Sequence, residues 1–180
     1  HICVFSIKKL MKSKKNLVFL GMMGSGKSSI GTLLAKRLNL KFIDIDKQIE
    51  IESGLTIRKI FETKNEDFFR KLEEKITLRV LKLKSTVIAL GGGAFINRNI
   101  KKEVIKNHLS FWLNWDSKIL ISRIKNSKKR PVAFEASEDE LIDLIKYRSC
   151  FYSKALYEIK CDNLSKNEII NEIIKIYETN

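Results

Sequence analysis

The sequence predicts an α/β fold, a three-layer α/β/α sandwich built around a central parallel sheet. Two observations lead to this prediction. Short apolar segments alternate with helical segments along the 180-residue chain, and such alternation is typical of parallel strands joined by right-handed crossovers. The glycines also gather in two loops that follow apolar segments, and open α/β sheets hold their ligands at the carboxyl ends of strands.

Short apolar segments predict the strands, and apolar residues spaced three to four apart predict the helices. The expected strands are 16–20, 41–45, 86–90, 109–114 and about 158–162. The expected helices are 28–40, a short segment ending at Gly54, 56–63, about 65–84, about 97–107, and three that begin near Asp116, Ser137 and Ser165. Ser137 with Glu140, and Ser165 with Glu168, match the capping box that begins many helices.

Residues 11–180 are expected to form a single domain, because a chain of 180 residues fills one core of ordinary size. Its 44% hydrophobic and 31% charged residues are typical of a globular protein. Residues 1–10 place their lysines after an apolar run, which is the reverse of a signal peptide. We therefore expect them to be an added or alternative-start extension before a natural beginning at Met11.

The sequence favours a monomeric cytoplasmic protein. No segment approaches the roughly 20 consecutive apolar residues that span a bilayer, so no membrane association is expected. Cys3, Cys150 and Cys161 lack the spacing of a disulfide framework or a zinc site, and we expect reduced thiols.

A formal net charge of +14 raises the alternative of a non-catalytic nucleotide- or nucleic-acid-binding module. The lysines are scattered along the chain, however, and no aromatic residues alternate with them in a recognisable motif. Dispersed charge of this kind does not form the patch that phosphates require. We therefore expect no nucleic-acid partner.

The segment Gly21–Ser28 reads GMMGSGKS and matches the P-loop pattern GxxxxGK followed by Ser or Thr. It lies between an expected strand and an expected helix, as a P-loop does. Its glycines let backbone amides wrap phosphate oxygens, Lys27 reaches the outer phosphates of ATP, and Ser28 can ligate Mg²⁺. The residues expected to contact ATP here are Gly24, Ser25, Gly26, Lys27, Ser28 and Ser29.

The strand expected at 41–45 supplies two acids, Asp44 and Asp46, in the sequence FIDID. A period of two places both carboxylates on one side of a strand as it ends. One can then lie beside magnesium and the other beside an acceptor hydroxyl. The alternative is a pair of solvent-facing acids that cap a helix.

From Lys15 onward the sequence resembles the shikimate kinases, which are P-loop NTPases of the nucleoside monophosphate kinase-like fold. The resemblance rests on an ordered set of motifs: GMMGSGKSSIG, FIDID, FRKLEE at 69–74, LGGGA at 90–94, KRP at 129–131 and YR at 147–148. Their combination is more specific than any single motif.

The resemblance implies the substrate site, with a substrate-binding region at about 44–73. Asp44 matches the acid near magnesium, and Asp46 matches the acid that holds the shikimate hydroxyls and acts as general base. Arg70 and Arg148 match the two arginines that bind the shikimate carboxylate, which suits planar guanidinium groups. The backbone of Gly91, Gly92 and Gly93 would approach the substrate closely.

Three further assignments support that site. Glu73 would brace Arg70 across one helical turn, and Phe61 and Phe69 resemble apolar walls of the substrate pocket.

On the ATP side the resemblance implies a lid at about 125–137, with Arg130 closing onto the phosphates, where a cation stabilises the transferring group. Lys27, Asp46 and Arg130 would then be the catalytic residues. Arg123 matches the arginine that stacks on adenine. The segment 161–164 departs from the family's adenine loop, and we assign no adenine contact there.

The reaction implied by the resemblance is transfer of the γ-phosphoryl group of ATP to the 3-hydroxyl of shikimate, a step of chorismate and aromatic amino-acid biosynthesis. A different P-loop small-molecule kinase, such as a gluconate or nucleoside monophosphate kinase, is the alternative. The paired arginines and the triple glycine argue against that alternative.

Overall fold

The computed structural model of the chain describes residues 15–126 and 136–180. Within them, five strands form one sheet in the order β2-β3-β1-β4-β5, and all four pairings are parallel. The strands are β1 (Leu17–Leu20), β2 (Lys41–Asp44), β3 (Thr86–Ala89), β4 (Leu109–Asn114) and β5 (Tyr157–Lys160). The predicted parallel sheet is therefore confirmed. The extension proposed at residues 1–10 and the lid residue Arg130 lie outside the described residues.

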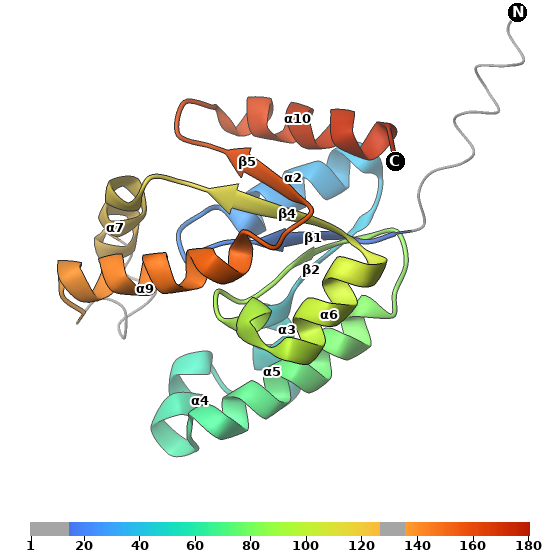
Figure 1. Ribbon diagram of the computed structural model, residues 1–180. Helices are drawn as coiled ribbons and strands as arrows, with labels where there is room; N and C mark the ends of the chain where they lie inside the picture. Colours follow the sequence, from blue (N-terminus) through green and yellow to red (C-terminus); the bar gives the residue numbers. More distant parts are fainter. Residues whose placement is uncertain (1–14, 127–135) are drawn as a thin grey trace, which may run out of the picture.

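Helices cover both faces of this sheet (Figure 1). In chain order they are α2 (Lys27–Leu38), α3 (Ile45–Ser53), α4 (Ile57–Thr63), α5 (Glu66–Leu81), the 3₁₀ turn η1 (Ala94–Ile96), α6 (Arg98–Asn107), α7 (Ser117–Lys125), α9 (Glu138–Tyr152) and α10 (Lys166–Glu178). No helix among the described residues is long and apolar enough to cross a membrane.

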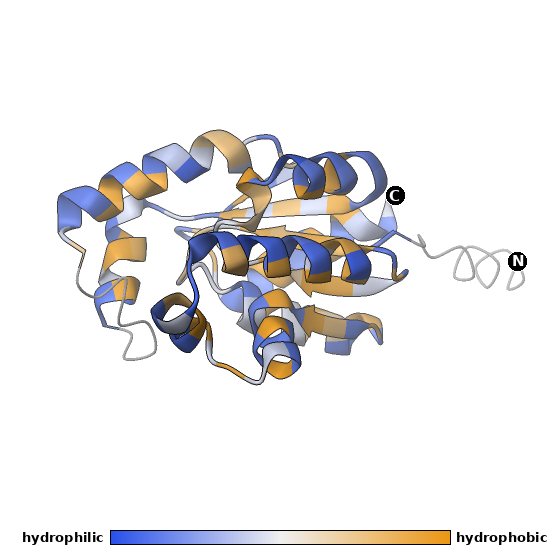
Figure 2. Cartoon of the chain, turned by 90° about the horizontal axis from the view of Figure 1, so that it is seen from below, coloured by the Kyte–Doolittle hydropathy of each residue, from blue (hydrophilic) through white to orange (hydrophobic). Residues whose placement is uncertain are grey.

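The alternation of side chains along β1 divides the core into two layers. Leu17 and Phe19 pack with buried residues of α2 and α10, whereas Val18 and Leu20 pack with those of α5, α6 and α9. Successive strand residues point to opposite faces, so a fully buried strand must be apolar throughout. Figure 2 shows mostly hydrophobic strands and helices of mixed hydropathy. The three-layer sandwich follows from this pattern.

The helix boundaries agree with the expected segments to within a few residues, with one difference that concerns the site. Both predicted capping boxes are present, at Ser137 with Glu140 and at Ser165 with Glu168. The strand expected at 41–45, however, ends at Asp44, and helix α3 begins at Ile45. The prediction that Asp44 and Asp46 share one side of a strand is therefore wrong.

Candidate active site

The P-loop joins β1 to α2 and forms the floor of an open pocket of about 270 Å³. Gly24 and Gly26 have φ values of +81° and +89°, a region that favours glycine. The Lys27 ammonium donates hydrogen bonds to the backbone carbonyls of Gly21, at 2.7 Å, and Met22, at 3.0 Å. The pocket is lined by Gly24, Gly26, Lys27, Ser28, Ser29, Asp44, Asp46, Ala89, Leu90 and Gly92.

Ser28 and Asp44 lie against each other on one wall of this pocket, where the Ser28 hydroxyl donates a hydrogen bond to the Asp44 carboxylate. Asp44 also caps helix α3 by accepting a hydrogen bond from the backbone N–H of Lys47, at 3.3 Å. Mg²⁺ prefers hard oxygen ligands and is usually held by one or two carboxylates together with substrate phosphates. A hydroxyl and a carboxylate side by side at the end of a P-loop fit that ion.

Asp46 reaches the same pocket from the first turn of α3. Because Asp44 is the N-cap, the chain turns into the helix directly after it, and the second acid is carried by the helix instead of the strand. The two acids still line one pocket, because the chain turns into α3 at Asp44 and not because they alternate along a strand. The capping alternative also holds for Asp44, which caps α3 as well as contacting Ser28.

Charged side chains from three helices meet at the triple-glycine loop that follows β3. A Cβ atom built on Gly91 would lie 2.7 Å from Asp46 Oδ1 and 2.6 Å from Glu73 Oε1. On Gly93 it would lie 2.7 Å from Arg70 Nη1. Real Cβ atoms essentially never show such distances, so the loop must lack side chains for these groups to approach it.

The fourth group is Arg148, from α9. A Cβ atom on Gly92 would lie 3.1 Å from Arg148 Nη1. Asp46, Arg70 and Arg148 are far apart in the sequence, but the fold brings all three to one short loop beside the P-loop pocket.

Arg70 is held by two acids of its own helix. Its Nη1 donates to Glu73 Oε2 at 2.7 Å, and its Nε donates to Glu66 Oε1 at 3.3 Å. The predicted brace between Glu73 and Arg70 is thus confirmed. Burial raises the pKa of Glu73, and the Arg70 charge opposes that rise. The Arg70 charge therefore favours the ionised form of this buried acid.

Arg148 is less completely paired. Its Nη1 lies 3.9 Å from Met22 Sδ, a weak acceptor. Its Nε is buried and, among the described residues, has no hydrogen-bond partner. A guanidinium group with unused donors beside a pocket is suited to bind an anion.

Sequence reasoning missed two residues that support Arg148 and the loop. Tyr152 is buried, and its hydroxyl donates a hydrogen bond to the Gly92 carbonyl; burial raises its pKa to about 12. Met22 contacts both Arg148 and Tyr152 through its sulfur. Tyr152 follows Arg148 by four residues and so lies on the same helical face. This spacing is the sequence signal that could have indicated its place beside Arg148.

The remaining predicted site residues differ in how far the structure describes them. Arg123 lies beside the P-loop and donates to the Gly24 carbonyl at 3.2 Å. Phe69 is buried in the core and Phe61 is exposed, with ring centroids 4.8 Å apart. Arg130 lies outside the described residues.

Comparison with known proteins identifies the family that this site belongs to. The family model described as shikimate kinase matches residues 23–178. The chain belongs to the shikimate kinase family. Shikimate kinases from Bartonella quintana and Bacillus subtilis are 37% and 38% identical to it, covering 97% and 90% of this chain and 85% and 88% of theirs. Like them, this family member is an ATP-dependent kinase.

Solved structures agree with that assignment. The shikimate kinase from Acinetobacter baumannii, determined in complex with shikimate, is 28% identical with a TM-score of 0.87, covering 96% of this chain and 97% of its own. The one from Aquifex aeolicus is 32% identical with a TM-score of 0.80, covering 89% and 94%.

More distant kinases share the fold alone. A gluconokinase from Sinorhizobium meliloti is 15% identical with a TM-score of 0.54, covering 93% of this chain and 96% of its own. The gluconate kinase alternative is not supported, because the family model and the relatives of 37% and 38% identity are shikimate kinases.

Proposed function

We propose that this enzyme binds shikimate between Asp46, Arg70, Arg148 and the loop 91–93, and transfers the γ-phosphoryl group of ATP to its 3-hydroxyl. The observation that carries the proposal is the convergence of two guanidinium groups on the triple-glycine loop, together with the carboxylates of Asp46 and Glu73, beside the P-loop pocket. Shikimate combines one carboxylate with several hydroxyls, and this set of side chains matches that chemistry.

Binding of the substrate would begin with its carboxylate. Arg70 is already fixed by Glu73 and Glu66, and Arg148 has an unpaired buried donor. Two planar guanidinium groups can form charge-assisted hydrogen bonds to one carboxylate, which would select an acidic substrate over a neutral sugar.

In the transfer step, the 3-hydroxyl oxygen would attack the γ-phosphorus of ATP while the bond from that phosphorus to the bridging oxygen breaks and ADP leaves. Asp46 would orient the hydroxyl and accept its proton. Lys27 would exchange its present carbonyl contacts for phosphate oxygens. Ser28 and Asp44 would hold magnesium, which supplies positive charge against the phosphates. Most of the rate would come from positioning and charge, because phosphoryl transfer needs little covalent help.

The substrate assignment can be tested by measuring ADP release with shikimate, gluconate or AMP as acceptor. We expect rapid turnover with shikimate and, with the other two, only the slow hydrolysis of ATP by water. Turnover of gluconate or AMP at a rate equal to that of shikimate would overturn the proposal.

Replacing Gly93 by alanine is expected to raise the KM for shikimate about tenfold, which is the scale of a moderate steric conflict. The new methyl group would meet the Arg70 guanidinium and push it from its position. The KM for ATP should stay within about twofold, because the P-loop is untouched. The effect is measured by steady-state kinetics.

A double-mutant cycle tests the cause of that effect. With Arg70 already changed to alanine, Gly93→Ala should have little further effect on shikimate use. Additive losses would contradict an action through Arg70.

We also infer that the enzyme works as a monomer in the cytoplasm with reduced thiols. Cys161 is buried and Cys150 is exposed, and both are free. Burial raises the pKa of the Cys161 thiol to about 12, which keeps it unreactive. Light scattering during size-exclusion chromatography would contradict the monomer if it gave twice the mass of the chain.

A further inference from the structure

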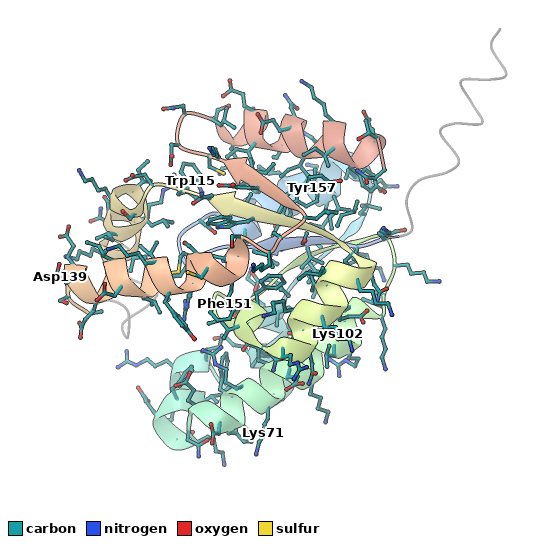
Figure 3. All side chains as sticks on the ribbon, viewed as in Figure 1. Lys71, Lys102, Trp115, Asp139, Phe151 and Tyr157 are labelled. Atoms are coloured by element: carbon teal, nitrogen blue, oxygen red, sulfur yellow. The ribbon has the colours of Figure 1, made fainter. Side chains whose placement is uncertain are left out.

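Trp115 lies between β4 and α7, where Figure 3 labels it. Its indole Nε1 donates a hydrogen bond to the backbone carbonyl of Ser25, in the P-loop, at 2.9 Å. The ring is partly buried and packs against both core clusters. Trp115 therefore ties the phosphate-binding loop to the start of α7, across 90 residues of sequence.

The face of this ring holds Arg123. The Arg123 guanidinium carbon lies 3.9 Å from the Trp115 ring centroid, within the range of a cation–π contact. The same guanidinium donates to the Gly24 carbonyl at 3.2 Å. The guanidinium group is thus held by two independent contacts, one with the indole ring and one with the P-loop.

The start of α7 is also fixed from a third direction. The backbone N–H of Asp116 donates to Asp162 in the loop after β5, at 2.6 Å. The Asp116 side chain caps α7 by accepting from the Lys118 N–H. Arg123 itself remains solvent-exposed. The start of α7 is therefore anchored to the P-loop and to the loop after β5, while Arg123 stays exposed beside the P-loop.

We propose that Trp115 is a positioning residue for the nucleotide base: it holds the Arg123 guanidinium flat, so that the outer face of this group stacks on the adenine of ATP. The base, the guanidinium and the indole would form three layers. The inference rests on the role at the adenine base that the family resemblance implies for Arg123, and it belongs to the ATP side of the proposed function. Trp115 would act through Arg123, without touching the nucleotide itself.

The three-layer arrangement has a consequence for base selection. Guanidinium groups stack on planar rings, and a two-ring purine offers a larger face than a one-ring pyrimidine. A guanidinium held parallel to the base distinguishes the two, whereas a freely rotating one contributes mainly charge. Because the indole also binds the Ser25 carbonyl, the base platform and the phosphate loop keep a constant relative position.

The test compares the affinities of ADP and CDP, measured by titration calorimetry, in four proteins: the unchanged enzyme, Trp115→Ala, Trp115→Phe and Arg123→Ala. We expect the unchanged enzyme to prefer ADP, and Trp115→Ala to reduce that preference about fivefold, the scale of one cation–π contact. Trp115→Phe keeps an aromatic face but loses the bond to Ser25. It should weaken both nucleotides and retain the preference.

Trp112→Phe is the matched control, because the chain has two tryptophans and Trp112 packs in the core against Tyr152, with ring centroids 6.0 Å apart. It should leave the ADP to CDP ratio unchanged. In this variant Trp115 is the sole tryptophan, so its fluorescence should change on addition of ADP. An unchanged emission at saturating ADP would overturn the proposal even where Trp115→Ala fails to fold.

The outcomes separate the role of Trp115 from the role of Arg123 on which it rests, and shikimate turnover tests the proposed function independently. If Arg123→Ala leaves the ratio of ADP to CDP affinity unchanged, Arg123 does not contact the base, and the inference is overturned. A ratio reduced by Arg123→Ala but not by Trp115→Ala would overturn the role of Trp115 alone. Equal losses of ADP and CDP affinity in Trp115→Ala would indicate a purely structural residue and would also overturn it.

Discussion

Arg70→Ala is expected to reduce kcat/KM for shikimate about a thousandfold, the scale of a lost bidentate charge-assisted contact and a buried acid left without its partner. The affinity for ADP should stay within about twofold, because Arg70 lies at the triple-glycine loop and not among the residues that line the P-loop pocket. Steady-state kinetics and ADP titration measure the two quantities. An equal loss of ADP affinity would contradict a carboxylate-binding role.

Two further variants define this effect. Arg79→Ala is the matched control, since Arg79 lies on the same helix α5 and pairs with Glu52 at the surface. It should leave both kcat/KM for shikimate and the affinity for ADP unchanged. Arg70→Lys keeps a cation beside Glu73 but loses the planar fork, so it should recover stability and only part of the activity. Full recovery would show that charge alone is needed.

Asp46→Asn is expected to lower kcat about a hundredfold or more, because the amide cannot accept the hydroxyl proton. The change preserves shape and hydrogen-bonding length, so the KM for ATP should change little. Single-turnover measurement of product formation at saturating shikimate isolates the chemical step. A kcat unchanged by this substitution would exclude Asp46 as the general base.

Asp67→Asn is the control for that variant. Asp46 and Asp67 are each the second residue of their helix, α3 and α5, so both changes remove one acid from a helix N-terminus. Asp67 is exposed and is not among the residues that line the P-loop pocket. Any loss of kcat common to both variants would therefore come from the helix end and not from catalysis.

Local signals in the sequence were sufficient to predict the helices, the strands and the phosphate-binding loop. The P-loop is a continuous segment whose strand, glycines and helix lie within a few turns of each other, so residues 21–28 alone predict its conformation. The same holds for the capping boxes at Ser137 and Ser165, where each hydrogen bond spans three residues. Such contacts join residues that are close in the sequence, so a local pattern can predict them.

The position of Asp46 shows where a local pattern can mislead. Alternation along 41–45 is compatible with one more strand residue, but Asp44 accepts the Lys47 N–H and begins a helix instead. The same carboxylate also accepts a hydrogen bond from Ser28, on another element. Both acids line one pocket, but the strand period that predicted their shared side does not apply to them.

Patterns along the chain were enough to predict the fold class, the phosphate loop and, through the ordered motifs, the family. That Arg70, Arg148 and Asp46 meet at the glycines of loop 91–93 is visible only in the folded chain. The same holds for the bond from Tyr152 to the Gly92 carbonyl and for the contacts of Trp115 with the P-loop and Arg123. These contacts join residues separated by tens of positions, and their geometry depends on how helices from both faces pack at one end of the sheet. No periodicity along the chain encodes a distance of that kind.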